Sequence, residues 1–142
     1  MVEEKNSMRH YLIASHSILS QGFREALEML TGENGCLRIL TAYVDESDVE
    51  GEIEKIVNGI SKEDELIVMT DIYGGSVNNI FMQYINRENF YLIAGINLPL
   101  LVSITVSHCA DTAAMIRENV AVAKESIIYC NDLLDREIDI NF

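Results

Sequence analysis

The sequence predicts a three-layer α/β/α domain with a mostly parallel sheet between two layers of helices. Short apolar runs alternate four times with segments whose apolar residues have helical spacing. Parallel strands joined in this way need right-handed crossovers, because each helix must pack back onto the sheet. The length of 142 residues is typical of one domain, and 49% hydrophobic residues can build a sizeable core.

The first strand is expected at residues 11–14, an apolar run that is too short for a helix and is bounded by polar residues. A helix should follow over residues 18–30, where apolar residues recur every three or four positions, and Thr31-Gly32 supplies its stop. Gly22 inside this helix costs about 1 kcal/mol relative to alanine. Either a close approach to another element or simple tolerance must explain it.

Residues 36–44 are rich in Leu, Ile, Thr, Tyr and Val, a composition that predicts the second strand. The acidic loop at residues 45–48 offers capping side chains to a second helix at residues 49–60. That helix has an apolar stripe on one face and charged residues on the other, which we interpret as a solvated surface. The nearly all-apolar residues 65–70 predict the third strand, which runs directly into Asp71.

The second half of the chain continues the pattern. We expect a helix at residues 77–85, a strand at residues 90–94 and a helix capped by Asn97, with Pro99 tolerated in its first turn. A further helix fits residues 112–124, and residues 126–130 form a last β segment. The domain then spans residues 9–130, between a short disordered lead at residues 1–8 and an acidic tail at residues 131–142.

Charge and composition exclude several classes of protein. The formal charge of −13 disfavours nucleic acid and anionic membranes as partners and favours a basic protein instead. Cys36, Cys109 and Cys130 form no paired framework, which indicates free thiols in a reducing compartment. No apolar run approaches the roughly 20 residues that cross a bilayer, and the polar N-terminus is not a signal peptide. We therefore expect a cytoplasmic protein.

Two polar loops are expected to meet at one edge of the sheet. In the strand order 2-1-3-4 the first and third strands are neighbours, and sites lie at the carboxyl ends of the strands. Ser15-His16-Ser17 follows the first strand and Asp71 follows the third. A carboxylate that accepts the Nδ1–H of His16 would leave Nε2 with a free lone pair, so His16 is a candidate nucleophile and Asp71 its orienting partner.

The residues beside this pair are suited to holding an anion. Gly74-Gly75-Ser76 places backbone N–H groups at the start of a helix, and Ser17 adds a further donor. Together these parts favour phosphoryl transfer to His16, which requires positioning and charge stabilisation. Each signal also has a structural interpretation, since histidines after strands often pack or cap, Gly-Gly often marks only a turn, and Asp often caps a helix.

Over about residues 9–130 the sequence resembles the enzyme IIA components of the mannose-type (mannose/fructose/sorbose) phosphoenolpyruvate-dependent sugar phosphotransferase system. Ser15-His16-Ser17 lies where that family carries its phosphorylated histidine. The loop Asp71-x-x-Gly74-Gly75-Ser76 and the turn Gly95-Ile96-Asn97-Leu98-Pro99 are similar to two further motifs of the family. Tyr73 stands where the family often has tryptophan, and Ser15 and Ser17 replace its usual flanking glycines.

The resemblance implies that the phosphocarrier HPr phosphorylates His16 on Nε2 and that a IIB component then accepts the phosphoryl group. It implies no metal or cofactor, and contact with the membrane only indirectly, through the IIC/IID transporter. It also implies a homodimer in which residues 126–130 cross to the neighbouring subunit as an antiparallel strand, whereas the sequence alone favours an edge strand in its own sheet.

Other interpretations stay open. A Ser-His-Ser sequence also resembles the phosphotransferase subunit of dihydroxyacetone kinases, and a noncatalytic flavodoxin-like binding module is a further alternative. A receiver domain would need an acidic cluster after the first strand. A metal hydrolase would need a third ligand, and His108 is predicted to lie far from the motif, so we expect it and His10 to be surface or capping residues. A serine hydrolase would need the G-x-S-x-G turn, which the sequence lacks.

Overall fold

The protein is described from a computed structural model, of which residues 7–135 are described. Its sheet contains β1 (Arg9–His16), β2 (Leu37–Ala42), β3 (Glu65–Thr70) and β4 (Phe90–Ala94) in the order β2-β1-β3-β4. All neighbouring strands pair in parallel, with Ala14 opposite Thr70 at the carboxyl end of the β1–β3 pair. The predicted fold class and strand order are confirmed.

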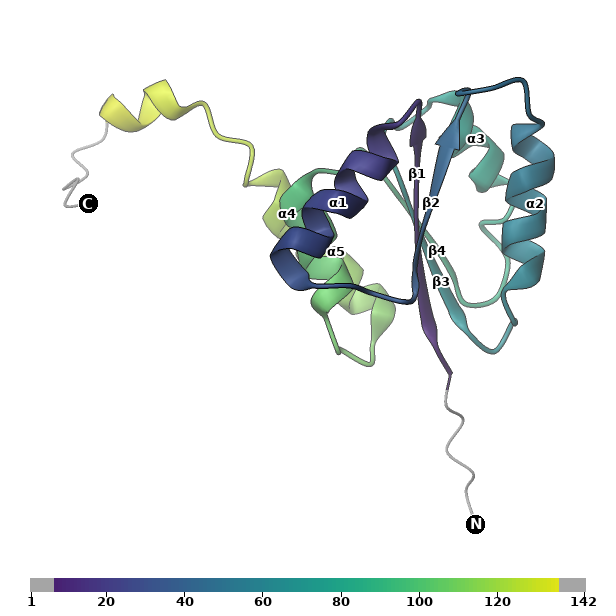
Figure 1. Ribbon diagram of the computed structural model, residues 1–142. Coiled ribbons are helices and arrows are strands. Elements are labelled where there is room, and N and C mark those ends of the chain that lie inside the picture. Colours follow the sequence, from purple (N-terminus) through teal and green to yellow (C-terminus); the bar gives the residue numbers. More distant parts are fainter. Residues whose placement is uncertain (1–6, 136–142) are drawn as a thin grey trace, which may run out of the picture.

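The helices lie in two layers, one on each face of the sheet (Figure 1). On one face are α1 (Leu19–Thr31), α4 (Leu98–Val106) and α5 (Thr112–Lys124). The other face is covered by α2 (Val49–Gly59) and α3 (Ser76–Met82). Among residues 7–135, no helix has the length and apolar character needed to cross a bilayer.

Each face of the sheet has its own apolar core, because successive side chains of a strand point to opposite faces. In β1, Leu12 and Ala14 join the core under α2 and α3, whereas Tyr11 and Ile13 join the core under α1, α4 and α5. Both faces are therefore buried, which explains why β1 and β3 are continuous apolar runs rather than alternating ones.

The helix ends follow their capping residues. Gly32 ends α1 with φ 84° and donates its N–H to the carbonyl of Glu28. Asn97 begins α4 as predicted, since its side-chain oxygen accepts the N–H of Leu100 at 3.1 Å. A Cβ added at Gly22 would meet no atom within 4 Å, so this glycine reflects tolerance rather than close packing.

The predicted last strand at residues 126–130 is not formed. Residues 127–129 have no regular structure, and η1 (Cys130–Asp135), a 3₁₀ helix, follows them. Ile127 lies near the end of β4, and the segment then leads away from the body of the domain (Figure 1) and forms no ladder with any strand of the described residues. We call residues 126–135 the C-terminal arm.

The two predicted ends of the domain are only partly described. Met8, which we assigned to the N-terminal lead, pairs with the start of β3, because its carbonyl accepts the N–H of Glu65 at 2.8 Å. The rest of the predicted lead, residues 1–6, and residues 136–142 of the predicted tail lie outside the described residues.

Candidate active site

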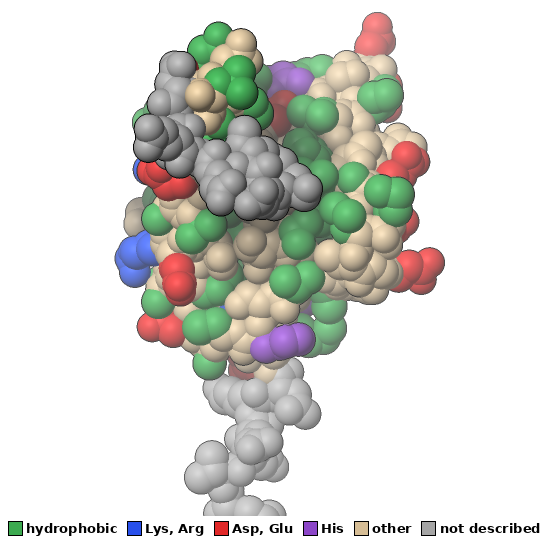
Figure 2. Space-filling view, turned by 90° about the vertical axis from the view of Figure 1, so that its left-hand side faces the viewer, with side chains coloured by type: hydrophobic (Ala, Val, Ile, Leu, Met, Phe, Trp, Pro, Cys, Tyr) green, Lys and Arg blue, Asp and Glu red, His purple; other side chains and the backbone are tan. Residues whose placement is uncertain are grey.

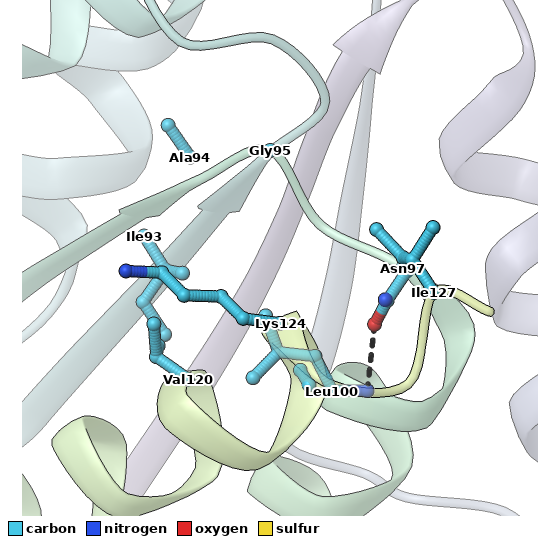
Figure 3. Close-up of a pocket in the computed structure, with 9 residues that line it drawn as sticks. Ile93, Ala94, Gly95, Asn97, Leu100, Val120, Lys124 and Ile127 are labelled. Carbon is cyan, nitrogen blue, oxygen red and sulfur yellow. Dashed lines mark hydrogen bonds between the residues drawn. The ribbon is translucent and has the colours of Figure 1, made fainter.

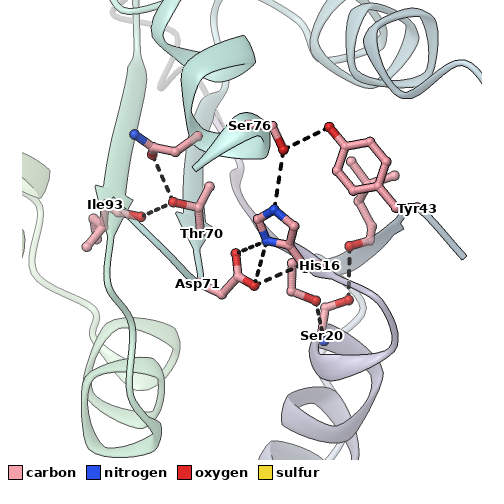
Figure 4. A network of polar contacts seen from close by, with 10 residues as sticks. His16, Ser20, Tyr43, Thr70, Asp71, Ser76 and Ile93 are labelled. Atoms are coloured by element: carbon pink, nitrogen blue, oxygen red, sulfur yellow. Dashed lines mark hydrogen bonds and ion pairs between the residues drawn. The ribbon is translucent and has the colours of Figure 1, made fainter. Parts of the chain in front are cut away.

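His16 and Asp71 are in contact at the carboxyl edge of the sheet (Figure 4). His16 ends β1 and Asp71 directly follows β3, so the parallel pairing of these strands brings the two residues together. Nδ1 of His16 lies 3.2 Å from Oδ1 and 3.1 Å from Oδ2 of Asp71. The backbone N–H of His16 also donates to Oδ2, at 2.9 Å. The carboxylate therefore holds both the backbone and the ring of His16.

This contact determines which nitrogen of the imidazole is available. A carboxylate only accepts hydrogen bonds, so the ring proton of neutral His16 belongs on Nδ1 and the lone pair on Nε2. The side chain of Asp71 is 8% exposed and that of His16 is 36% exposed. The carboxylate is thus buried, whereas the imidazole reaches the surface with Nε2 at the end remote from Asp71.

The glycine loop between Asp71 and α3 packs against the ring. A Cβ at Gly75 would lie 3.2 Å from Cε1 of His16 and 3.3 Å from the carbonyl oxygen of Ile72. Gly74 has φ 75°, a left-handed conformation that favours glycine. The two glycines let α3 begin against the imidazole, with Ser76 as its first residue and Oγ of Ser76 3.3 Å from Nε2 of His16.

The two serines beside His16 have different positions. Ser15 is fully buried, and its hydroxyl accepts the N–H of Ser20 at 2.6 Å, so it anchors the start of α1 beneath the site. Ser20 in turn donates its hydroxyl to the carbonyl of Leu40 at 3.0 Å. Ser17 has φ 54° and an exposed side chain, and its backbone N–H donates to the carbonyl of Ala42. The hydroxyl of Ser17 is not brought into contact with His16.

Tyr73 also lies at the surface. Its side chain is 81% exposed on the loop that follows β3. Large apolar side chains in the loops after β1, β2 and β3 are exposed in the same way, namely Ile18, Tyr43, Val44, Ile72 and Tyr73. Exposed apolar side chains gathered at one edge are typical of a surface that docks another protein.

Sequence reasoning missed Tyr43. The hydroxyl of Tyr43 donates to Oγ of Ser76 at 2.9 Å, and its ring lies 5.7 Å from that of His16 at an interplanar angle of 30°. The sequence predicts this residue in the second strand, but β2 ends at Ala42 and Tyr43 has φ 64°. A signal existed, because β2 neighbours β1 and the residue after β2 must lie at the same edge as His16.

The other two histidines lie elsewhere. Nε2 of His10 contacts Oδ2 of Asp64 at 3.0 Å at the start of β1, the opposite end of that strand. His108 lies in the segment between α4 and α5. Within the part of the chain that the structure describes, no group of three His, Cys, Asp or Glu residues could hold a metal ion.

Comparison with known proteins identifies the family. Residues 10–121 match the family model described as the PTS system fructose IIA component. The chain belongs to this family. It is a IIA component of the sugar phosphotransferase system, a family of phosphotransferases with a phosphocarrier role, and the resemblance to mannose-type IIA components is confirmed.

Solved structures of phosphotransferase system proteins support the assignment. A protein from Klebsiella pneumoniae assigned as a phosphoenolpyruvate-dependent sugar phosphotransferase system permease is 38% identical, with a TM-score of 0.87 over 94% of this chain and 99% of that one. A PTS IIA protein associated with the fucose utilization operon of Streptococcus pneumoniae is 27% identical, with a TM-score of 0.78 over 90% and 97%. The mannose/sorbose IIA subunit of Enterococcus faecalis shares the fold, with 17% identity and a TM-score of 0.73 over 85% and 93%.

Proposed function

We propose that His16 accepts a phosphoryl group from HPr on Nε2 and passes it to a IIB component for sugar uptake. The observation that carries this proposal is the position of Asp71, which occupies Nδ1 and leaves Nε2 as the nucleophile at the surface. The acidic composition and the absence of a bilayer-spanning helix among residues 7–135 agree with contact to the membrane only through the IIC/IID transporter, and we place the reaction in the cytoplasm.

The transfer exchanges one phosphorus–nitrogen bond for another. The lone pair of Nε2 forms a bond to phosphorus while the bond from phosphorus to the histidine of HPr breaks, and its electron pair returns to that imidazole. The substituted ring of His16 becomes cationic and keeps its proton on Nδ1. Asp71 stabilises this charge at 3.1 Å, and the reverse sequence delivers the phosphoryl group to IIB.

The phosphoryl group on Nε2 would lie against the start of α3. Oγ of Ser76 lies 3.3 Å from Nε2, Gly75 brings the backbone close to the ring without a side chain, and Gly74 forms the left-handed turn before it. We propose these three residues as the phosphate pocket. We keep Ser17 and Tyr73 as predicted members of the pocket. Ser17 would donate a hydrogen bond, and Tyr73 would be an aromatic neighbour at the exposed rim.

The proposal is tested by phosphorylation in a purified system. Incubation with phosphoenolpyruvate, enzyme I and HPr should add one acid-labile phosphoryl group, seen by intact mass, to nearly every chain. Omission of HPr should prevent the addition, and a IIB component should then remove the group. A chain that stays unmodified would contradict the proposal. Release to the nucleotide-binding subunit of a dihydroxyacetone kinase, but not to IIB, would favour the alternative family.

We further propose that the chain is a homodimer joined through the C-terminal arm. β4 is an edge strand, with one side unpaired within the described sheet. A pocket of about 100 Å³ lies beside this edge, between the end of β4 and α5, and is lined mostly by apolar groups that include Ile93, Val120 and Ile127 (Figure 3). Ile127, Ile128 and Tyr129 of the arm are 78%, 53% and 67% exposed. An exposed apolar arm and an unpaired edge suit an exchange of strands between two copies.

Sedimentation velocity at micromolar concentration should therefore show a dimer for the full chain and a monomer after removal of residues 126–142. Met29→Glu is the control, because it places a charge at an 80% exposed site on α1, outside the arm. If the arm forms the interface, this variant should remain a dimer. A full chain that sediments only as a monomer would rule out the exchange. Figure 2 shows the side of the molecule formed by α1, α4 and α5, where exposed hydrophobic side chains lie among charged ones.

A further inference from the structure

Tyr43 is connected to the nucleophilic nitrogen through one serine (Figure 4). The phenol hydroxyl donates to Oγ of Ser76 at 2.9 Å, and that oxygen lies 3.3 Å from Nε2 of His16. Each hydroxyl has one proton. Since Tyr43 supplies the proton of the first bond, the proton of Ser76 is available for Nε2, the acceptor within reach. The donors therefore point in one direction, from Tyr43 to Ser76 to His16 to Asp71.

The backbone of Tyr43 has a positive φ, a conformation often found at functional sites. Its φ of 64° is uncommon for a bulky residue, and such strained residues cluster at functional sites. Core burial does not hold the side chain, which is 52% exposed. The contacts that orient it are the tilted ring pair with His16 and the bond to Ser76.

We propose that Tyr43 is a positioning residue for phosphoryl transfer, and that it acts through Ser76. In the free protein its hydroxyl holds the Ser76 hydroxyl on Nε2. When Nε2 becomes bonded to phosphorus, it no longer has a lone pair, and the Ser76 proton turns to a phosphoryl oxygen while Tyr43 keeps the Ser76 oxygen in place. This inference rests on the proposed phosphorylation of His16.

The effect should be larger in the phosphorylated state than in the free state. A hydrogen bond to a charged phosphoryl oxygen is about twice as strong as one between neutral groups. Loss of the Tyr43 hydroxyl should therefore destabilise phosphorylated His16 more than free His16. Tyr43→Phe keeps the ring over the imidazole and removes only the hydroxyl. We expect the equilibrium constant for transfer from phosphorylated HPr to His16 to fall about three- to tenfold, the change produced by losing one hydrogen bond between neutral groups.

A double-mutant cycle tests whether Tyr43 acts through Ser76. Ser76→Ala should lower the transfer equilibrium at least as much as Tyr43→Phe, and the double variant should behave like Ser76→Ala alone. Tyr84→Phe is the matched control, because it removes the same hydroxyl beyond the far end of α3 and should change nothing. An unchanged equilibrium in Tyr43→Phe, or fully additive effects, would overturn the inference.

A second measurement needs no phosphorylation. In the free protein, the ¹⁵N resonance of Nε2 reports the hydrogen bond that this nitrogen accepts. Tyr43→Phe should move it part of the way toward its position in Ser76→Ala, whereas Tyr84→Phe should not move it. A resonance unaffected by Tyr43→Phe would refute the positioning role even if His16 is phosphorylated. If Tyr43→Phe shifts the resonance but HPr never phosphorylates the wild-type chain, only the proposed function is refuted.

Discussion

Replacing His16 with alanine is expected to abolish phosphorylation by HPr completely. The variant removes the only imidazole of the site, and none of its neighbours can replace the nitrogen: Ser76 and Tyr43 carry hydroxyls, and Asp71 is buried beneath the ring. The fold should persist, since the site lies at the edge of the sheet and the cores on its two faces do not include His16. Intact mass after incubation with phosphoenolpyruvate, enzyme I and HPr gives the result directly.

The chain supplies its own matched control. His10 also pairs with a carboxylate, Asp64, at 3.0 Å, and it lies on the same strand. However, its contact uses Nε2, and its side chain is 15% exposed. His10→Ala and His108→Ala should therefore both accept one phosphoryl group, as the wild type does. A phosphoryl group that remains in His16→Ala and disappears in His10→Ala would move the site to the other end of β1.

The fold was predictable because each local signal agreed with the others. Apolar runs too short for helices alternated with segments of helical spacing, and this pattern leaves few topologies. The strand order then placed the residues after β1 and β3 side by side. The contact between His16 and Asp71 follows from that order, although the two residues are far apart in the sequence.

Tyr43 and the C-terminal arm were harder to predict, for different reasons. Tyrosine is common in strands, so nothing in a β-rich run marks the point where the backbone turns to a positive φ. The arm has a strand-like composition, but a strand forms only when another strand pairs with it, and within the described residues the arm pairs with none. Ser15 replaces a glycine that is usual in the family, and its role was also not predictable from the sequence. Its hydroxyl accepts the N–H of Ser20 and so anchors the start of α1 beneath the site.

Asp71→Asn is expected to slow phosphoryl transfer by up to roughly ten-thousandfold, the loss seen when an amide replaces the carboxylate that orients a catalytic histidine. The backbone N–H of His16 donates to Asp71 at 2.9 Å and would keep the single amide oxygen. The amide NH₂ would then face Nδ1 as a donor, so the ring proton would move to Nε2 and block the nucleophile. The loss of charge would also leave the cationic phosphorylated ring without its counter-ion.

The rate should be measured by rapid quench with phosphorylated HPr, together with the ¹⁵N spectrum of the imidazole. Asp64→Asn is the control, because it makes the same change beside His10 and should leave the rate unaltered. Since the amide keeps the bond to the His16 backbone, the unfolding temperature should change little. A normal rate with the proton still on Nδ1 would remove Asp71 from the mechanism. A slow rate with the proton on Nδ1 would instead assign its effect to charge stabilisation alone.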